Sequence, residues 1–136
     1  MSGSYRDLKA WQKSTDLVAE IYACTRAFPK DEQYGLVSQL RRAAVSVASN
    51  IAEGKGRSGD KELVRFLHQA RDHCAKSRPS LRLPIDSGLL SSENASRLNE
   101  AAGEIARMLN GLINALKRSM ATRRLMNKRL EPDDYA

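Results

Sequence analysis

The 136-residue chain is poor in the residues that brace very small proteins or anchor membrane proteins. It has two cysteines, four prolines, eight glycines and one tryptophan, and aromatic residues make up 5% of it. Two cysteines are too few for a disulfide scaffold, and so little glycine and proline excludes collagen-like and low-complexity chains. No apolar run approaches the roughly 20 residues that cross a bilayer, and residues 1–7 contain no signal-peptide core. We therefore expect a cytoplasmic protein with reduced thiols and no membrane span.

Positive charge is in excess and unevenly distributed. Lys and Arg number 23 against 16 Asp and Glu, a net charge of +7. Residues 1–40 are neutral and residues 83–116 are net negative, whereas residues 41–82 hold ten basic and four acidic groups, and residues 117–136 hold six and three. Such an excess favours an anionic partner, nucleic acid or a membrane surface, although a run of charge also forms ordinary solvated helix faces.

Apolar residues recur at helical spacing along almost the whole chain, and no alternating pattern competes. The pattern predicts four helices, over about residues 8–28, 31–53, 58–88 and 91–118. The first has one apolar stripe: Leu8, Trp11, Thr15, Val18, Ile21, Thr25 and Phe28. We expect Pro29 to end that helix, Gly54 and Gly56 to terminate the second, and Ser58 to cap the third.

Four helices joined by short turns predict an all-α fold, an antiparallel up-down-up-down four-helix bundle over residues 1–118. Residues 119–136 form a basic C-terminal extension that either prolongs the last helix or frays, and we expect residues 131–134 to be disordered. The extension could contact RNA, a protein partner or anionic lipid.

Several strings are specific enough to suggest a family. Residues 39–54 read QLRRAAVSVASNIAEG and residues 5–13 read YRDLKAWQK, and shorter matches are FPK at 28–30, YGL at 34–36, ELVRFL at 62–67 and MLNGL at 108–112. Together they resemble the four-helix-bundle family named after proteins encoded in 23S rRNA intervening sequences, over about residues 5–118.

The resemblance implies more about the fold than about the function. Members of that family are small, basic and not known as enzymes, and they form ring-shaped homo-oligomers, pentamers in the characterised cases. A related branch comprises accessory proteins of diversity-generating retroelements, which associate with a reverse transcriptase and with RNA. By this resemblance the chain is expected to assemble with itself into a ring, with a pentamer favoured.

Residues 72–80 depart from the family pattern. They read DHCAKSRPS, where the family continues its helix with a run such as Gly-Ser-Leu-Ala-Glu-Leu-Glu-Thr-Gln-Leu. Two acidic family positions become Lys76 and Arg78, and Pro79 enters the predicted helix, where proline costs about 3 kcal/mol. A family-like codon run read one nucleotide later encodes this string, so a compensated double frameshift, genetic or from sequencing, is one hypothesis for its origin.

Catalytic and metal-binding patterns are weak. A ferritin-like site needs Glu-x-x-His pairs, and neither His68 nor His73 follows a glutamate by three residues. Cys24 and Cys74 lie on or near apolar stripes, where free cysteine behaves as a small hydrophobe. Residues 54–59, GKGRSG, lack the spacing and the preceding strand of a phosphate-binding loop. We expect no enzyme activity, no catalytic residue, no metal, no cofactor and no small-molecule substrate.

The candidate nucleic-acid-binding residues are basic side chains that we expect near the corner between the second and third helices: Arg41, Arg42, Lys55, Arg57, Lys61 and Arg65. The aromatic residues Trp11, Tyr22, Phe28 and Phe66 lie on apolar stripes, so RNA contact should be directed at the backbone and sensitive to salt.

A second set on the second helix is expected to make polar contacts within the bundle or between subunits: Arg42, Ser46, Ser49, Asn50 and Glu53. An Arg42–Glu53 link to a neighbouring chain is one possible contact of this kind.

The sequence thus predicts a non-catalytic oligomeric bundle that binds RNA or a ribonucleoprotein partner through a basic surface. The alternative is a protein–protein scaffold or accessory subunit, for example of a reverse transcriptase, without direct RNA binding.

Overall fold

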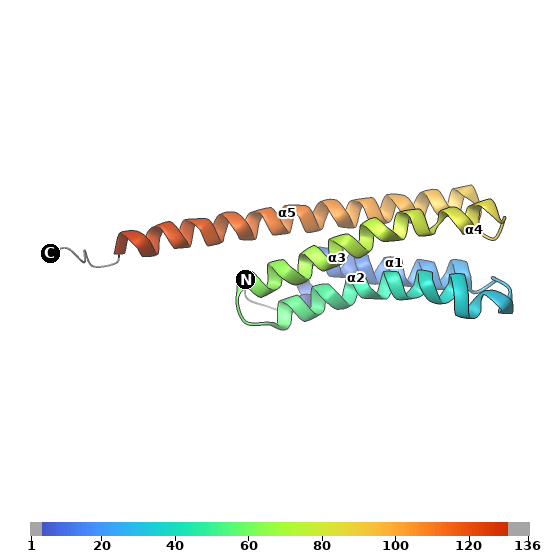
Figure 1. The fold of residues 1–136 in the computed structure, drawn as a ribbon, viewed down its shortest axis with the longest axis horizontal. Helices are drawn as coiled ribbons and strands as arrows, with labels where there is room; N and C mark the ends of the chain where they lie inside the picture. Colours follow the sequence, from blue (N-terminus) through green and yellow to red (C-terminus); the bar gives the residue numbers. More distant parts are fainter. Residues whose placement is uncertain (1–3, 131–136) are drawn as a thin grey trace.

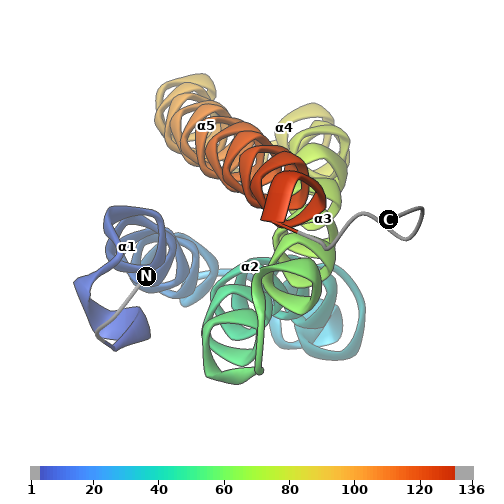
Figure 2. The same cartoon turned by 90° about the vertical axis from the view of Figure 1, so that its left-hand side faces the viewer.

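The computed structural model describes residues 4–130, and the regular elements in this range are all helical. Four long helices lie alongside one another: α1 (Lys9–Thr25), α2 (Ser38–Gly56), α3 (Asp60–Ser80) and α5 (Ser92–Leu130) (Figure 1). Consecutive long helices run in opposite directions, and α1 and α3 each pack against both α2 and α5 (Figures 1 and 2). The predicted antiparallel four-helix bundle is confirmed. Residues 131–134, expected to be disordered, lie outside the described residues.

The first helix is shorter than predicted, and its buried stripe is turned by one residue. Helix α1 ends at Thr25, and Phe28 is buried in the turn that follows. The buried side chains of α1 are Ala10, Ser14, Leu17, Ile21 and Thr25, whereas Trp11 and Val18 are only partly buried. Small residues at 10 and 14 fit where helices approach closely, and the Ser14 hydroxyl donates to the Ala10 carbonyl at 2.6 Å. This bond satisfies a hydroxyl that would otherwise be unpaired in the core.

The start of the second helical segment is irregular, in contrast to the continuous helix predicted from residue 31. A short 3₁₀ turn, η2 (Lys30–Glu32), leads into one π-helical turn, η3 (Gln33–Val37), and only then does α2 begin. Helix α2 also continues through Gly54 to Gly56, so Gly54 is not the terminator that the sequence suggested. Gly54 is buried within the helix, because it faces Phe66 of α3.

The third segment begins later and breaks earlier than predicted. Helix α3 starts at Asp60, and its first carbonyl acceptor is Gly59, which has a φ of +89° and accepts from the Leu63 amide at 3.3 Å. Ser58 is therefore not the cap. Helix α3 ends at Ser80, one residue after Pro79, and a short helix α4 (Arg82–Asp86) follows. Proline has no amide hydrogen to donate. In a continuous helix, Pro84 would leave the Ser80 carbonyl without its donor, just as Pro79 does for Ala75, and the expected single helix over 58–88 divides after Ser80.

The core is one continuous cluster with contributions from all four long helices. The side chains of Leu67, Ile51, Ile105, Leu109 and Ile113 are at most 1% exposed. Ser91 caps α5, because its hydroxyl accepts from the Asn94 amide at 3.1 Å. Among the described helices, none is long and apolar enough to cross a membrane.

Candidate nucleic-acid interface

The six predicted RNA-binding residues do not gather at one place. Lys55, Arg57, Lys61 and Arg65 belong to the end of α2, the turn and the first part of α3. Arg41 and Arg42 lie near the start of α2, and Arg41 precedes Lys55 by fourteen residues, which is about 21 Å at 1.5 Å per residue. The candidate site therefore divides into two parts, one at each end of α2.

At the α2–α3 turn, two arginines are held against one aromatic ring. The guanidinium carbons of Arg57 and Arg65 lie 5.5 and 4.4 Å from the centroid of the Phe66 ring. Arg57 also pairs with Glu53, and Arg65 with Glu62, each at 2.7 Å. Phe66 itself is buried, with 9% of its surface exposed, and the two surface arginines pack over its ring. Both arginines are thus oriented, and a neighbouring carboxylate offsets each charge.

The C-terminal extension meets this turn. Helix α5 continues without a break to Leu130, beyond the boundary at 118 that we expected between bundle and extension, and it projects past the α2–α3 turn (Figure 1). We call residues 117–130 the α5 arm. Arg123 of the arm forms an ion pair with Asp60, the first residue of α3. This contact brings the tail charge next to the α2–α3 turn.

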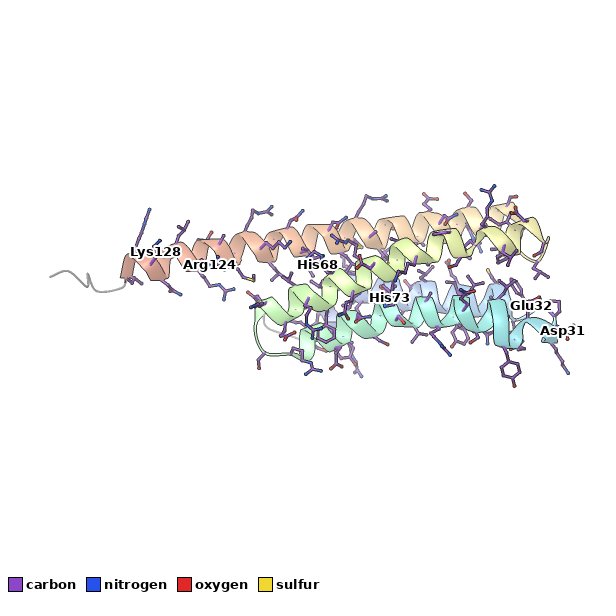
Figure 3. The ribbon with its side chains drawn as sticks, in the orientation of Figure 1. Asp31, Glu32, His68, His73, Arg124 and Lys128 are labelled. Carbon is purple, nitrogen blue, oxygen red and sulfur yellow. The ribbon has the colours of Figure 1, made fainter. Side chains whose placement is uncertain are left out.

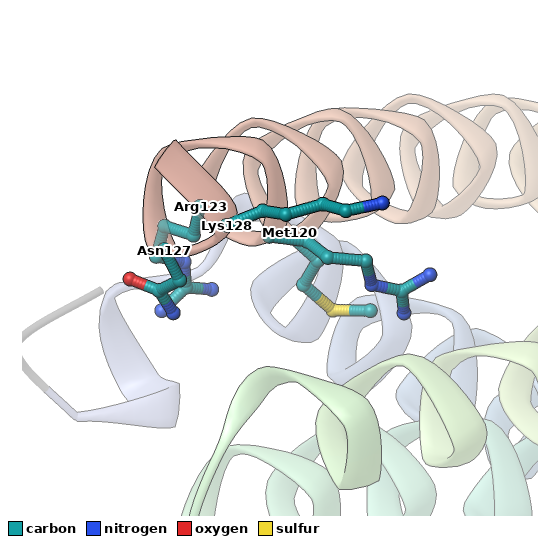
Figure 4. A pocket seen from close by; sticks show the side chains of 5 residues that line it. Met120, Arg123, Asn127 and Lys128 are labelled. Atoms are coloured by element: carbon teal, nitrogen blue, oxygen red, sulfur yellow. The ribbon is translucent and has the colours of Figure 1, made fainter. Parts of the chain in front are cut away.

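The arm continues the core-facing side of α5 with one half-buried methionine and then with polar residues. Buried Leu109, Ile113 and Leu116 are followed along the helix by Met120, Arg123 and Asn127. The latter three line a hollow beneath the arm, together with Arg124 and Lys128 (Figure 4); Figure 3 shows Arg124 and Lys128 on the arm. Sequence reasoning treated the arm separately from the turn. The continued three- and four-residue spacing from Leu116 to Asn127 is the signal that could have joined them.

Most of the positive charge at this end belongs to the arm. Residues 53–65 contain four basic and three acidic residues, whereas residues 117–130 contain six basic residues and no acidic one. The arm's side chains from Lys117 to Ser119 and from Ala121 to Leu130 are exposed. We define the basic end as residues 53–65 together with the α5 arm.

His68 lies on α3, close enough to Lys117, the first residue of the arm, to feel its charge. It is half-buried, and its pKa is lowered from 6.5, first by burial and then by the charges of Arg71 and Lys117, against an opposing effect of Asp72. A lowered pKa leaves the imidazole neutral at pH 7. His68 therefore adds no charge to the basic end, and Arg71 is instead tied to α5 by a 3.1 Å bond to Asn110.

At the other end of α2, Arg41 is fixed and Arg42 is accessible. The Arg41 guanidinium lies 4.3 Å from the Tyr22 ring centroid, and its Nε donates to the Thr25 hydroxyl at 3.0 Å. Arg42 makes no ion pair within the described part of the chain. Nearby Tyr34 is 98% exposed, an aromatic side chain that the sequence analysis did not consider for stacking. Its position off the apolar stripe of the second segment was the available signal.

The second predicted set, on α2, makes local contacts. The Ser46 hydroxyl donates to the Arg42 carbonyl at 2.8 Å, and Asn50 Nδ2 donates to the Ser46 carbonyl at 2.7 Å. Glu53 pairs with Arg57, and Ser49 is exposed. Within one chain these contacts of Ser46, Asn50 and Glu53 are therefore local to α2 and the residue that follows it.

The nucleophile and metal candidates are dispersed. Cys74 is buried and Cys24 is half-buried, and both are free thiols. Burial raises the pKa of the Cys74 thiol to about 11, so it is protonated at neutral pH. Across residues 4–130, no three His, Cys, Asp or Glu side chains form a group that could hold a metal ion.

These features define a class: a basic four-helix bundle with a long, positively charged final helix. The family model described as 23S rRNA-intervening sequence protein matches residues 6–111. The chain belongs to this family, as the motifs in the sequence suggested.

A solved structure supports the fold. The chain is similar to a crystal structure described as a protein with unknown function from the S23 ribosomal protein family, from Bacteroides thetaiotaomicron VPI-5482. The TM-score is 0.70 at 19% identity, and the match covers 77% of this chain and 95% of the other. No curated protein matches the chain.

Proposed function

We propose that this protein is a non-catalytic bundle that binds RNA, free or within a ribonucleoprotein, through its basic end. One observation carries the proposal: the Arg123–Asp60 contact joins an arm with six cations and no acid to the basic α2–α3 turn. Exposed cations on a rigid helix attract phosphates and release the counterions that surround them. The proposed location is the cytoplasm, where RNA is present and free thiols such as Cys24 persist.

The contacts should be made to phosphates. Arg57 and Arg65 are prepositioned on Phe66, and Arg124, Lys128 and Arg129 are exposed on the arm. Phosphate contacts fix the position of a nucleic acid but carry no sequence information. We therefore expect binding at this end to be weakly sequence-specific and strongly dependent on salt.

The test is fluorescence anisotropy with a labelled RNA at salt concentrations between about 50 and 200 mM. The arm variant carries three substitutions, Arg124→Gln, Lys128→Gln and Arg129→Gln. We expect it to bind RNA more weakly than the parent protein. The slope of log affinity against log salt should fall by about 0.7–0.9 for each phosphate that the variant no longer neutralises.

A matched control changes three exposed arginines at the opposite end of the bundle, Arg26, Arg82 and Arg97, to glutamine. It alters the net charge equally but should leave the slope nearer to that of the parent protein. Equal effects of the two triple variants would contradict a localised site, and no RNA binding by the parent protein at about 50 mM salt would exclude the function.

We also propose that the protein is a homo-oligomer, with a pentameric ring as the assembly that the family resemblance favours. Exposed apolar side chains support self-association, because monomers rarely leave large apolar surface uncovered. On the bundle these include Tyr22, Val45 and Leu83. Light scattering that gives the mass of one chain at micromolar concentration would contradict the ring.

A second candidate function is a protein scaffold or accessory subunit that contacts a polypeptide. Leu125, Met126 and Leu130 on the arm are 63%, 57% and 79% exposed, and phosphate binding does not account for them. An adjacent reverse-transcriptase gene would favour this candidate. Co-purification with that enzyme, retained after nuclease treatment and abolished in Leu125→Ser/Leu130→Ser, would establish it over RNA binding.

A further inference from the structure

Tyr34 is a solvent-exposed aromatic residue at the end of the molecule opposite the α5 arm. Its side chain is 98% exposed, and it lies in the π-helical turn η3, before α2 begins. Three separate hollows on the surface are each lined in part by Tyr34. A π-helical turn is uncommon and often marks a functional site. The turn here holds an aromatic ring away from the core, where both of its faces are accessible.

The largest of these hollows is a groove between α2 and α3, with a volume of about 540 Å³. Small-molecule sites typically measure roughly 300–1,000 Å³. Most of its lining residues carry polar side chains, and none is a carboxylate: Tyr34, Gly35, Ser38, Gln39, Arg42, Ala43, Ser46, His73, Lys76 and Ser80. Figure 3 shows His73 on α3, close to α2. Glu32 lies nearby, with Oε2 3.5 Å from the place that a Cβ on Gly35 would take.

Two of the hydroxyl groups in the groove are already oriented. Ser46 donates to the Arg42 carbonyl at 2.8 Å, and Ser80 donates to the Lys76 carbonyl at 2.9 Å. Because each hydroxyl proton is used within its own helix, the oxygen lone pairs remain as acceptors. The groove thus offers cationic donors from Arg42 and Lys76 and hydroxyl acceptors from the two serines.

We propose that this groove binds a phosphorylated nucleotide, with the base stacked on Tyr34 and the phosphate held by Arg42 and Lys76. An aromatic ring stacks on any base, a guanidinium and an ammonium group bind phosphate, and hydroxyl acceptors suit base or ribose donors. Arg41, which is fixed against Tyr22, adds positive charge in the neighbouring hollow on the other side of Tyr34.

The nucleotide could be free or could be an unpaired residue of single-stranded RNA. In its RNA form this inference rests on the proposed function, since the groove would then hold one end of a strand whose phosphates reach the basic end. The two parts of the surface differ in what they recognise. The basic end has accessible cations, whereas the groove combines cations with a stacking ring and should therefore prefer unpaired bases.

Titration calorimetry with adenosine 5′-monophosphate and with adenosine tests the free form, and anisotropy with a short single-stranded RNA and its duplex tests the RNA form. Tyr34→Ala should weaken binding of the monophosphate and of the single strand by about five- to 150-fold, while duplex binding stays the same. Tyr34→Phe keeps the ring and should bind like the parent protein. Folding is not at risk, because Tyr34 packs against nothing in the core.

Arg42→Gln/Lys76→Gln should reduce binding of the monophosphate but not of adenosine. If the monophosphate binds as tightly as the single strand, the natural ligand is a free nucleotide, and if the strand binds more tightly it is RNA. Either result supports the groove site. Loss of all RNA binding in the arm variant with the monophosphate still bound would overturn an RNA ligand for the groove and leave the free nucleotide.

Three results would overturn the proposal. The first is unchanged binding of both ligands in Tyr34→Ala. The second is a change only in the sedimentation coefficient of that variant, which would make Tyr34 a contact between protein chains. The third is a gene whose codons 72–80 encode a family-like run, because His73, Lys76 and Ser80 would then be absent from the groove. None of these results bears on the salt dependence at the basic end, so the proposed function is tested separately.

Discussion

Gly54 of α2 and Phe66 of α3 lie closer than any other residue at position 54 would permit. A Cβ built on Gly54 would stand 2.6 Å from the Phe66 Cβ and 3.2 Å from Leu63 Cδ1. Gly54 is therefore a contact point between the two helices. The guanidinium groups of Arg57 and Arg65 pack over the ring of the same Phe66. The close approach of Gly54 and Phe66 therefore also positions two cations of the basic end.

We predict that Gly54→Ala destabilises the bundle. Alanine favours a helix over glycine by about 1 kcal/mol, but overpacking costs about 1–3 kcal/mol or more, and the clashing Phe66 atom is a Cβ that cannot rotate away. Denaturant unfolding should show a lower free energy of unfolding. Gly111→Ala is the control, because a Cβ there meets nothing within 4 Å, and it should stabilise by about 0.5–1 kcal/mol. Equal effects of the two substitutions would contradict the close contact.

Pro79→Ala is predicted to stabilise α3. Alanine restores the amide donor that proline lacks near the end of the helix, and the gain should be about 1–3 kcal/mol. Pro84→Ala serves as the comparison. Pro84 is buried in the first turn of α4, where no helical donor is needed, so its replacement should destabilise. Thermal unfolding of both variants measures the difference, and a loss of stability in Pro79→Ala would show that the break is required.

The two thiols should differ in reactivity. Burial raises the pKa of Cys74 from 9.0 to about 11, and its side chain is 1% exposed, whereas Cys24 is half-buried. Because the thiolate is the reactive form, a thiol reagent at pH 8 should modify Cys24 first and Cys74 only as the protein unfolds. Equally rapid modification of the remaining thiol in Cys24→Ala and in Cys74→Ala would disprove this.

The same group links stability to pH. The folded-state pKa of Cys74 lies above the unfolded value, so its contribution is complete below pH 9 and is lost as pH rises from 9 toward 11. The free energy of unfolding should fall over this window more steeply in the parent protein than in Cys74→Ala, which lacks the group. Parallel curves for the two proteins would contradict this contribution of Cys74.

The Asp60–Arg123 contact should orient the arm rather than stabilise the fold. The Arg123 side chain is 58% exposed, and exposed ion pairs contribute no more than about 1 kcal/mol. Asp60→Asn is expected to change the melting temperature little but to increase amide hydrogen exchange in residues 119–130. Lys13→Gln, which removes a 3.7 Å pair with Glu104 away from the arm, is the control and should leave that exchange unchanged.

Periodicity located the four helices because each must bury one stripe. In the second segment it predicted burial of Leu36, Leu40, Ala44, Val47 and Ile51, and all but Leu36 are buried; Val37 is buried in its place. It failed for α1, where the stripe passes through Ala10 and Ser14 instead of Trp11 and Thr15. A sequence pattern places large apolar residues such as Trp11 in the core, but small residues decide where two helices can approach closely. That information depends on the partner helix and is absent from the pattern of one segment.

The candidate site also divides into features that the sequence predicts and features that depend on packing between helices. The sequence identified its cations, since charge can be counted, and the α5 seam could be followed toward the arm. The predicted helix over residues 31–53 already implied that Arg41 and Arg42 are separated from Lys55 by most of its length, but the sequence could not show that Arg123 reaches Asp60 across 63 positions of sequence. The sequence likewise could not predict that the ring of Tyr34 is almost fully exposed to solvent.

The shortage of cysteine, aromatic residues and long apolar runs, together with 3- and 4-residue spacing, was enough to determine a helical bundle, because burial of one stripe per helix leaves few other arrangements. Only the tertiary structure decided that Gly54 is a packing contact, that α5 continues as an arm, and that two basic segments meet at one end. These features depend on distances between helices, and such distances are set by the packing of side chains from segments remote in sequence.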